Sequence, residues 1–141
     1  MLVRLLYASR IAASVDAAAL AAIVRQSKAH NAKAGVTGVL CASGGLFMQV
    51  LEGGRGAVNR LYSRIVVDPR HSDVELLLYE EIGERRFAGW SMGQVDLASL
   101  NPALLLKYSE TAALDPYAVS GRASMALFEE LAATAAVCAT R

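Results

Sequence analysis

A glycine pair joins two strongly apolar runs in the first half of the chain. The runs are VTGVLCAS (residues 36–43) and LFMQVLE (residues 46–52), with Gly44 and Gly45 between them. Glycine tolerates the positive φ angles that short hairpin loops require. The segment is therefore predicted to be a β-hairpin, and any fold of this chain must hold two neighbouring antiparallel strands here.

Amphipathic helices are predicted on both sides of this hairpin. Asp16 is a suitable N-cap for an alanine-rich helix that runs to about Asn31. A second helix is predicted over residues 56–67, and Asp68-Pro69 ends it. The stripes at helical spacing are Leu20, Ile23, Val24 and Ser27 in the first helix, and Val58, Leu61, Tyr62 and Ile65 in the second. Each helix therefore has one face to bury, and Asn31 lies at the end of the first stripe.

Three further strands complete the predicted sheet. They are residues 2–8, with Val3, Leu5 and Tyr7 on one face, residues 74–82, and residues 90–95, with Trp90 and Met92 on one face. The resulting order is βαββαββ, and both helices must cover the same sheet. This pattern predicts an α+β sandwich of the ferredoxin-like kind.

The opposite face of such a sheet needs its own cover, which the C-terminal part of the chain can supply. Asn101-Pro102 begins a short helical stretch, Asp115-Pro116 breaks it, and a longer helix is predicted over residues 121–137. Its apolar stripe is Met125, Phe128 and Ala132, while Glu129 and Glu130 face away. We therefore divide the chain into a sheet-and-helix domain, residues 1–97, and a helical extension, residues 98–141, packed on the sheet.

Charge and hydropathy exclude several classes of function. The 14 basic and 13 acidic residues give a net charge of +1, so the chain has no electrostatic footprint for nucleic acid or an anionic membrane. No apolar run reaches the roughly 18 residues of a spanning helix, and the N-terminus lacks the features of a signal peptide. We expect a soluble cytoplasmic protein.

The sequence gives little support for a metal site, a phosphate-binding loop or a catalytic pair of carboxylates. Cys41 and Cys138 show no zinc-type spacing and are interpreted as reduced thiols, and two histidines, His30 and His71, do not make a metal site by themselves. The glycine-rich segment at residues 52–56 matches no phosphate-binding motif and is interpreted as a turn. The adjacent glutamates at residues 80–81 and 129–130 diverge on a strand or helix, so they are interpreted as solvated surface.

Three polar side chains occur where apolar ones are expected. Gln49 interrupts a densely apolar strand, Tyr7 belongs to the core face of the first strand, and Asn31 ends the buried helix stripe. Convergent polar groups in an apolar cleft are typical of a small-ligand site. Each residue also has an ordinary interpretation: Gln49 can bond to backbone or to a tyrosine, Tyr7 can be core, and Asn31 can cap its helix. Spacing alone leaves both interpretations open.

Several segments together resemble the BLUF photoreceptors, a family of blue-light sensors that use FAD. The resemblance covers about residues 2–97, and the tail segment LKYSE (106–110) is similar to that of short stand-alone members. It rests on LLYAS (5–9), QSKAHNAKAGVTGVL (26–40), FMQVLEG (47–53), RIVVDPRHSDV (64–74) and RRFAGWSM (85–92), in order and spacing.

The resemblance implies a flavin held between the two helices. FAD is the expected cofactor, with FMN or riboflavin as alternatives. Tyr7 and Gln49 match the photoactive pair, and Trp90 and Met92 match residues that pass the signal on. The other cofactor-binding positions implied are Ile23, Ser27, His30, Asn31, Ile65, Arg70 and His71, together with Tyr7 and Gln49 themselves.

The implied mechanism is a light-driven rearrangement of hydrogen bonds with no net reaction. The excited flavin oxidises Tyr7, Gln49 rearranges by rotation or tautomerisation, and the fifth strand relays the change to the C-terminal helices. We expect no enzymatic activity, a separate downstream signalling protein as partner, self-association into a homo-oligomer, and no binding to nucleic acid or membrane. Two alternatives remain: an enzyme on a ferredoxin-like scaffold, such as a phosphatase or flavin-dependent reductase, and a colourless interaction module.

Overall fold

The computed structural model of the chain describes residues 1–95, 101–133 and 137–138. Its elements follow the order β1 (Leu2–Ile11), α1 (Ala17–Ala34), β2 (Thr37–Ser43), β3 (Leu46–Gly54), α2 (Arg55–Val67), β4 (His71–Ile82), β5 (Gly93–Val95), α3 (Pro102–Tyr108), α4 (Gly121–Ala133) and β6 (Val137–Cys138). None of the helices in these residues has the length and apolar character needed to span a membrane.

One sheet organises the molecule. Its strand order is β4-β1-β3-β2-β5-β6, with β2 and β5 parallel and all other neighbours antiparallel. The hairpin between β2 and β3 is confirmed: Gly44 and Gly45 have φ angles of 59° and 80° at its turn. The register of β1 against β3 places Tyr7 directly opposite Gln49.

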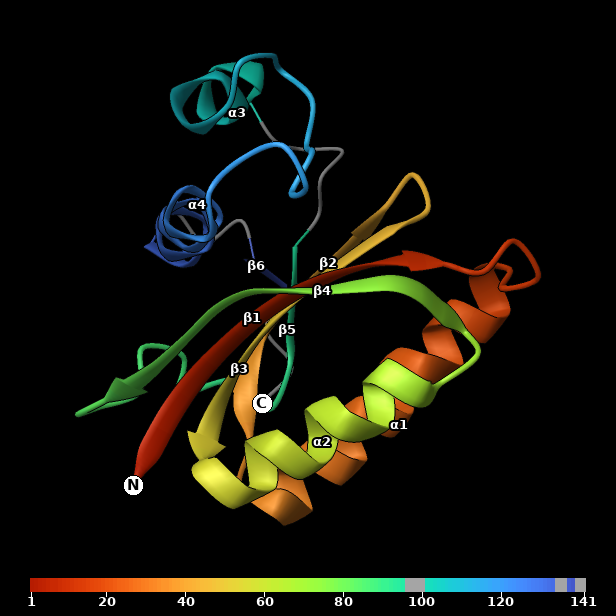
Figure 1. Cartoon of the computed structure of the whole chain (residues 1–141), viewed down its shortest axis with the longest axis vertical. Helices are drawn as coiled ribbons and strands as arrows, with labels where there is room; N and C mark the ends of the chain where they lie inside the picture. Colours follow the sequence, from red (N-terminus) through yellow and green to blue (C-terminus); the bar gives the residue numbers. More distant parts are fainter. Residues whose placement is uncertain (96–100, 134–136, 139–141) are drawn as a thin grey trace.

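Helices α1 and α2 lie side by side on one face of the sheet (Figure 1). As predicted, Asp16 caps α1, because its carboxylate accepts a hydrogen bond from the backbone N–H of Ala19 at 2.8 Å. Gly35 ends the helix in the left-handed region, with φ 71°. Side chains from both layers form the helix-side core, which includes Val3, Leu5, Tyr7, Val24, Phe47, Leu51, Val58 and Met92.

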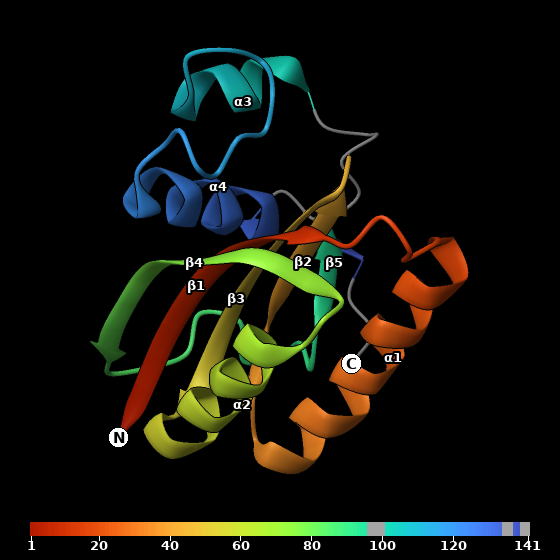
Figure 2. The same cartoon turned by 45° about the vertical axis from the view of Figure 1, so that its right-hand side comes forward.

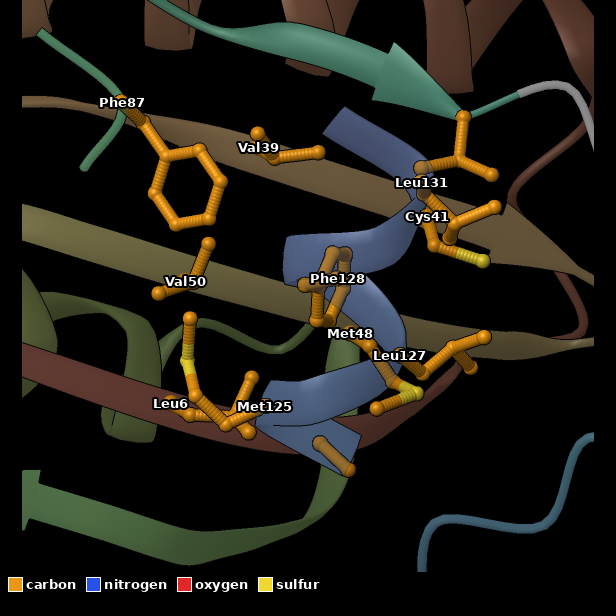
Figure 3. Packing of buried hydrophobic residues seen from close by; sticks show 12 residues of the cluster. Leu6, Val39, Cys41, Met48, Val50, Phe87, Met125, Leu127, Phe128 and Leu131 are labelled. Atoms are coloured by element: carbon orange, nitrogen blue, oxygen red, sulfur yellow. The ribbon is translucent and has the colours of Figure 1, made fainter. Parts of the chain in front are cut away.

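The C-terminal helices cover the opposite face, as Figure 2 shows. Helix α4 packs on the sheet through Met125, Leu127, Phe128 and Leu131, and these side chains meet Leu6, Val39, Cys41, Met48 and Val50 in the tail-side core (Figure 3). Glu130 faces α3, where its carboxylate bonds to Lys107 and Tyr108. The α+β ferredoxin-like sandwich with extra helices on the second face is therefore confirmed.

The structure corrects the prediction for the fifth strand. β5 is only Gly93–Val95, so Trp90 and Met92 precede it in an irregular connection, and strand alternation does not apply to them. Met92 belongs to the helix-side core, whereas Trp90 packs against the tail-side core. The prediction that they share one face is wrong.

Other boundaries also differ from the sequence pattern. Helix α4 is described over Gly121–Ala133, and Val137 pairs with Val95 in the sheet, so the helix does not extend to residue 137 as predicted. At residues 52–56 there is no separate turn: Gly54 is both the last residue of β3 and the N-cap of α2. The predicted division between residues 97 and 98 lies outside the described residues and stays a prediction.

Candidate functional site

A cleft of about 300 Å³ opens between the sheet and the two helices that cover it. Every residue predicted to bind the cofactor lines it, so the structure brings the polar groups of β1, α1 and β3 together. The full lining is Tyr7, Ile23, Gln26, Ser27, His30, Asn31, Phe47, Gln49, Leu61, Arg64, Ile65, Asp68, Arg70 and His71. A site of this size, with apolar walls and a few convergent polar groups, is suited to a small ligand.

Tyr7 and Gln49 form a direct hydrogen bond at the floor of this cleft. The Tyr7 hydroxyl donates to Gln49 Oε1 at 2.6 Å, and the exposed fractions of the two residues are 0% and 3%. Burial raises the pKa of Tyr7 well above its ordinary value, and Tyr62 and Asp68 add to this effect. The phenol therefore keeps its proton at physiological pH.

The other end of the Gln49 amide points to Met92. Gln49 Nε2 donates to the Met92 sulfur at 3.3 Å, and Met92 is fully buried. A thioether is a weak acceptor. The amide is thus held by a strong bond on its oxygen side and a weak one on its nitrogen side.

Asn31 has unused hydrogen-bonding capacity inside the cleft. It lies near the end of α1, is fully buried, and neither its Oδ1 nor its Nδ2 has a partner among the described residues. Leaving buried polar groups unsatisfied is costly, and native structures satisfy nearly all of them. A ligand edge that presents both a donor and an acceptor would satisfy this amide, and the ring of a flavin has such an edge. The donor set of the cleft therefore fits a flavin.

Charged groups gather at one side of the cleft. Arg70 forms an ion pair with Asp68, with Nη2 and Oδ2 2.6 Å apart, and its Nη1 lies 3.3 Å from Gln26 Oε1. Nearby, the Nδ1 atom of His71 lies 2.7 Å from the hydroxyl of Ser9. Burial lowers the pKa of His71 despite the opposing effect of the Asp68 carboxylate, so its imidazole is neutral at pH 7.

Sequence reasoning missed five residues of the lining. Gln26, Phe47, Leu61, Arg64 and Asp68 were not predicted. Helical spacing could have found three of them, because residues 23, 26, 27 and 30 share one face of α1 and residues 61, 64 and 65 share one face of α2. Strand alternation could have added Phe47, two residues before Gln49. No group of three or more metal-ligating side chains occurs in the part of the chain that the structure describes.

The structure settles which predicted relay residue is nearer the cleft. Met92 contacts Gln49, whereas the Trp90 ring stacks on Phe87 with a centroid separation of 6.1 Å. Phe87 belongs to the tail-side core. The two residues therefore lie on different sides of the sheet, one at the cleft and one beneath the C-terminal helices.

Comparison with known proteins agrees with this geometry. The family described as "BLUF: Sensors of blue-light using FAD" matches residues 2–93. The photoactivated adenylate cyclase subunit beta of Euglena gracilis is 38% identical over 92 residues, which cover 64% of this chain and 11% of that protein. The blue light- and temperature-regulated antirepressor BluF of Escherichia coli (strain K12) is 34% identical over 97 residues, covering 69% and 24%. The chain thus spans about a tenth of the cyclase relatives that it matches.

Two solved structures match nearly the whole chain. The dark-state structure of BlrB, a BLUF protein, has a TM-score of 0.80 and 34% identity, with 95% of this chain and 96% of that chain covered. The photo-activated state of BlsA has a TM-score of 0.84 and 29% identity, with 93% and 94% covered. From the cleft, the family match and these structures together, we conclude that the chain belongs to the BLUF family of flavin-based blue-light sensors.

Proposed function

We propose that this chain is a non-catalytic blue-light sensor whose photoactive pair is Tyr7 and Gln49. The observation that carries the proposal is the 2.6 Å hydrogen bond between the Tyr7 hydroxyl and Gln49 Oε1 inside the cleft. A phenol that loses an electron becomes far more acidic than its neutral form, so its proton passes readily to an acceptor in contact with it. In this site, Gln49 Oε1 is the acceptor in contact with that proton.

The flavin would be held by the residues that line the cleft. Asn31 would bond to the ring edge, because both of its amide atoms lack partners among the described residues. Ile23 and Ile65 would form the walls, and Arg70 with His71 the polar end. Ser27 and His30 line the same side of α1 and complete the predicted set. FAD is the flavin that we propose, with FMN or riboflavin as alternatives.

The chemistry of the site is a reversible movement of one proton and one electron. When bound, the flavin absorbs blue light and supplies an excited state that accepts an electron. Tyr7 is the donor, and as it loses the electron its hydroxyl proton passes to Gln49. On return of the electron, Tyr7 recovers a proton and ends chemically unchanged. The Gln49 side chain differs afterwards, either rotated with its covalent bonds intact or as a tautomer in which one proton has moved from nitrogen to oxygen.

The Gln49 amide acts as a two-state switch. It carries an acceptor and a donor at opposite corners, so rotation or tautomerisation exchanges what it offers to Tyr7 and to Met92. In the present orientation Nε2 donates to the Met92 sulfur. After rotation an oxygen would face that sulfur, and the attraction would be lost. Met92 is therefore the first residue to respond beyond the cleft.

The response would then reach the C-terminal helices by two routes, one through β5 and β6 and the other through Trp90. Met92 directly precedes β5, which pairs with β6 through Gln94 and Val95. Trp90, two residues before Met92, packs against the core beneath α4. A change at Met92 can therefore alter the docking of the tail, which is the bistable element that we propose as output.

The signal would pass to a separate downstream protein, with this chain acting as a homo-oligomer. Both the separate partner and the homo-oligomer stay predictions from the sequence. A cytoplasmic location and the lack of nucleic-acid or membrane partners stay predictions from the sequence.

The visible absorption spectrum of the purified holoprotein tests the proposed function. We expect a flavin spectrum that shifts slightly to longer wavelength after blue light and returns in darkness. A flavin that bleaches would indicate reduction, as in a reductase. A protein that stays colourless after flavin is added would contradict the sensor and favour the hydrolase or the interaction module.

A further inference from the structure

A buried carboxylate lies on the sheet face opposite the cleft. Glu52, on β3, has an exposed side-chain fraction of 0%, and Arg4, its cross-strand neighbour on β1, has 7%. Arg4 Nε and Nη2 lie 2.9 and 2.7 Å from Glu52 Oε2. Arg4 also contacts Glu80 on β4 at 2.7 Å. A charge this deeply buried needs both an opposite charge and several hydrogen bonds.

The remaining hydrogen bonds of Glu52 go to the connection between β4 and β5. The backbone N–H of Arg86 donates to both carboxylate oxygens, at 3.0 and 3.1 Å, and that of Phe87 donates to Oε1 at 2.7 Å. These two residues follow β4 by only a few positions, where the chain has neither helix nor strand. One charged side chain thus holds two consecutive backbone groups of an irregular segment.

The far end of the same connection reaches the photoactive pair. Met92 accepts from Gln49, and the Trp90 carbonyl accepts from the Gly38 N–H at 3.1 Å. The rings of Phe87 and Trp90 stack on each other, with Phe87 inside the tail-side core and Trp90 packed against it. The segment from residue 86 to residue 92 is therefore fixed by Glu52 at its start and by the sheet at its end.

We propose that Glu52, held in place by Arg4, is a positioning residue for the light response. Glu52 does not line the cleft, so it acts through the connection: it sets where Met92 meets Gln49 and where Trp90 meets the tail. This inference rests on the proposed role of Gln49 as the switch. It adds an anchor that links the two sheet faces, since the carboxylate lies on the tail side and Met92 belongs to the helix-side core.

Glu80 provides a matched control. Its carboxylate is also paired with Arg4, but its side chain is 45% exposed, and among the described residues it makes no hydrogen bond to the connection. Glu52→Gln and Glu80→Gln each remove one negative charge beside the same arginine and keep the side-chain shape. Only the first change weakens the acceptor for the N–H groups of Arg86 and Phe87.

The experiment compares these variants as holoproteins by two readouts. Trp90 is the sole tryptophan of the chain, so its emission reports on the connection without requiring any photochemistry. We expect Glu52→Gln to shift the Trp90 emission to longer wavelength and to change the rate of dark recovery by about threefold or more, while Glu80→Gln changes neither. Unchanged Trp90 emission and unchanged recovery in Glu52→Gln would overturn the proposal.

A double-mutant cycle tests whether Glu52 acts through Met92. In a Met92→Ala background, Glu52→Gln should change dark recovery by less than about twofold, because the contact that it positions is already gone. If Glu52→Gln and Met92→Ala change the rate of dark recovery additively, the proposal is wrong.

If Glu52→Gln does not fold, the double variant Arg4→Met/Glu52→Gln removes both buried charges, and we expect the same results from it. Absence of a light-induced shift in the wild type would refute the proposed function, whereas the Trp90 emission would still decide whether Glu52 holds the connection.

Discussion

Gln49 and Met92 share a weak hydrogen bond, Nε2 to sulfur at 3.3 Å, on the side of the amide opposite Tyr7. The amide therefore bridges the proposed electron donor and the segment that leads to β5. This relationship assigns the two predicted relay residues to different tasks. Under the proposed function Met92 would respond to the amide that it contacts, whereas Trp90 packs against the core beneath the C-terminal helices.

The unsatisfied Asn31 amide predicts opposite effects on flavin binding and on stability. Asn31→Leu removes hydrogen bonds to the flavin, so we expect flavin affinity to fall by about 1–3 kcal/mol. In the flavin-free protein the same change removes a buried unsatisfied amide, so the free energy of unfolding should stay the same or rise. Titration calorimetry and urea unfolding measure the two quantities.

Asn59→Leu, on the exposed side of α2, is the control for this pair of measurements and should leave flavin affinity unchanged. Equal flavin affinity in Asn31→Leu and the wild type would show that Asn31 does not contact the flavin.

Burial of His71 predicts a loss of stability in mild acid. Because its pKa in the folded state is lowered below the ordinary value of about 6.5, the folded protein binds fewer protons there than the unfolded chain. The free energy of unfolding should therefore fall as the pH drops through that value. His71→Gln should reduce this slope between pH 7 and 5 in urea titrations of the flavin-saturated protein. An identical slope in His71→Gln would contradict the assignment.

The close approach of Gly121 to β4 predicts that a larger residue at this position would weaken the docking of α4 on the sheet. A Cβ at this position would lie 2.0 Å from the Leu77 carbonyl oxygen of β4, although alanine normally favours a helix over glycine. We therefore expect Gly121→Ala to lower the free energy of unfolding by about 1–3 kcal/mol and to speed hydrogen exchange in α4. Gly83→Ala is the control, because its Cβ would meet no atom within 4 Å. Stabilisation by Gly121→Ala would mean that this close approach does not exist.

Cys41 can report on movement of the C-terminal helices. It lies in the core beneath α4, and burial raises its pKa to about 12, so almost none of it is the reactive thiolate at pH 8 (Figure 3). In a Cys138→Ser background, Cys41 should react very slowly with a thiol reagent in darkness and faster under blue light. Tyr7→Phe, which should not switch, serves as the control. Equal rates in light and dark would exclude undocking of the tail as the output.

Regular elements and the walls of the cleft could be predicted from the sequence because they depend on local spacing. Period-two alternation assigned Tyr7 to the core face of its strand, and period-3.6 spacing placed Ile23, Ser27 and Asn31 on one stripe of their helix, as the structure has them. The glycine pair indicated the hairpin turn. These patterns repeat within a few residues, so they need no knowledge of the tertiary structure.

The connection before β5 could not be predicted in this way. Its path depends on Glu52, which binds backbone groups 34 and 35 residues further along the chain. A strand pattern over residues 90–95 therefore predicted Trp90 and Met92 on one face. The connection that Glu52 binds instead places these two residues on opposite faces of the sheet. The pairing of Arg4 with Glu52 is equally hidden, since it joins residues 48 positions apart.

The light-induced absorption shift of Tyr7→Phe, compared with that of Tyr62→Phe, shows whether Tyr7 is the electron and proton donor. The two tyrosine rings are neighbours, with centroids 5.7 Å apart, but it is the Tyr7 hydroxyl that donates to Gln49. We expect Tyr7→Phe to bind flavin and to show no reversible red shift, while Tyr62→Phe retains it. A normal red shift in Tyr7→Phe would contradict the assignment of Tyr7 as the electron and proton donor.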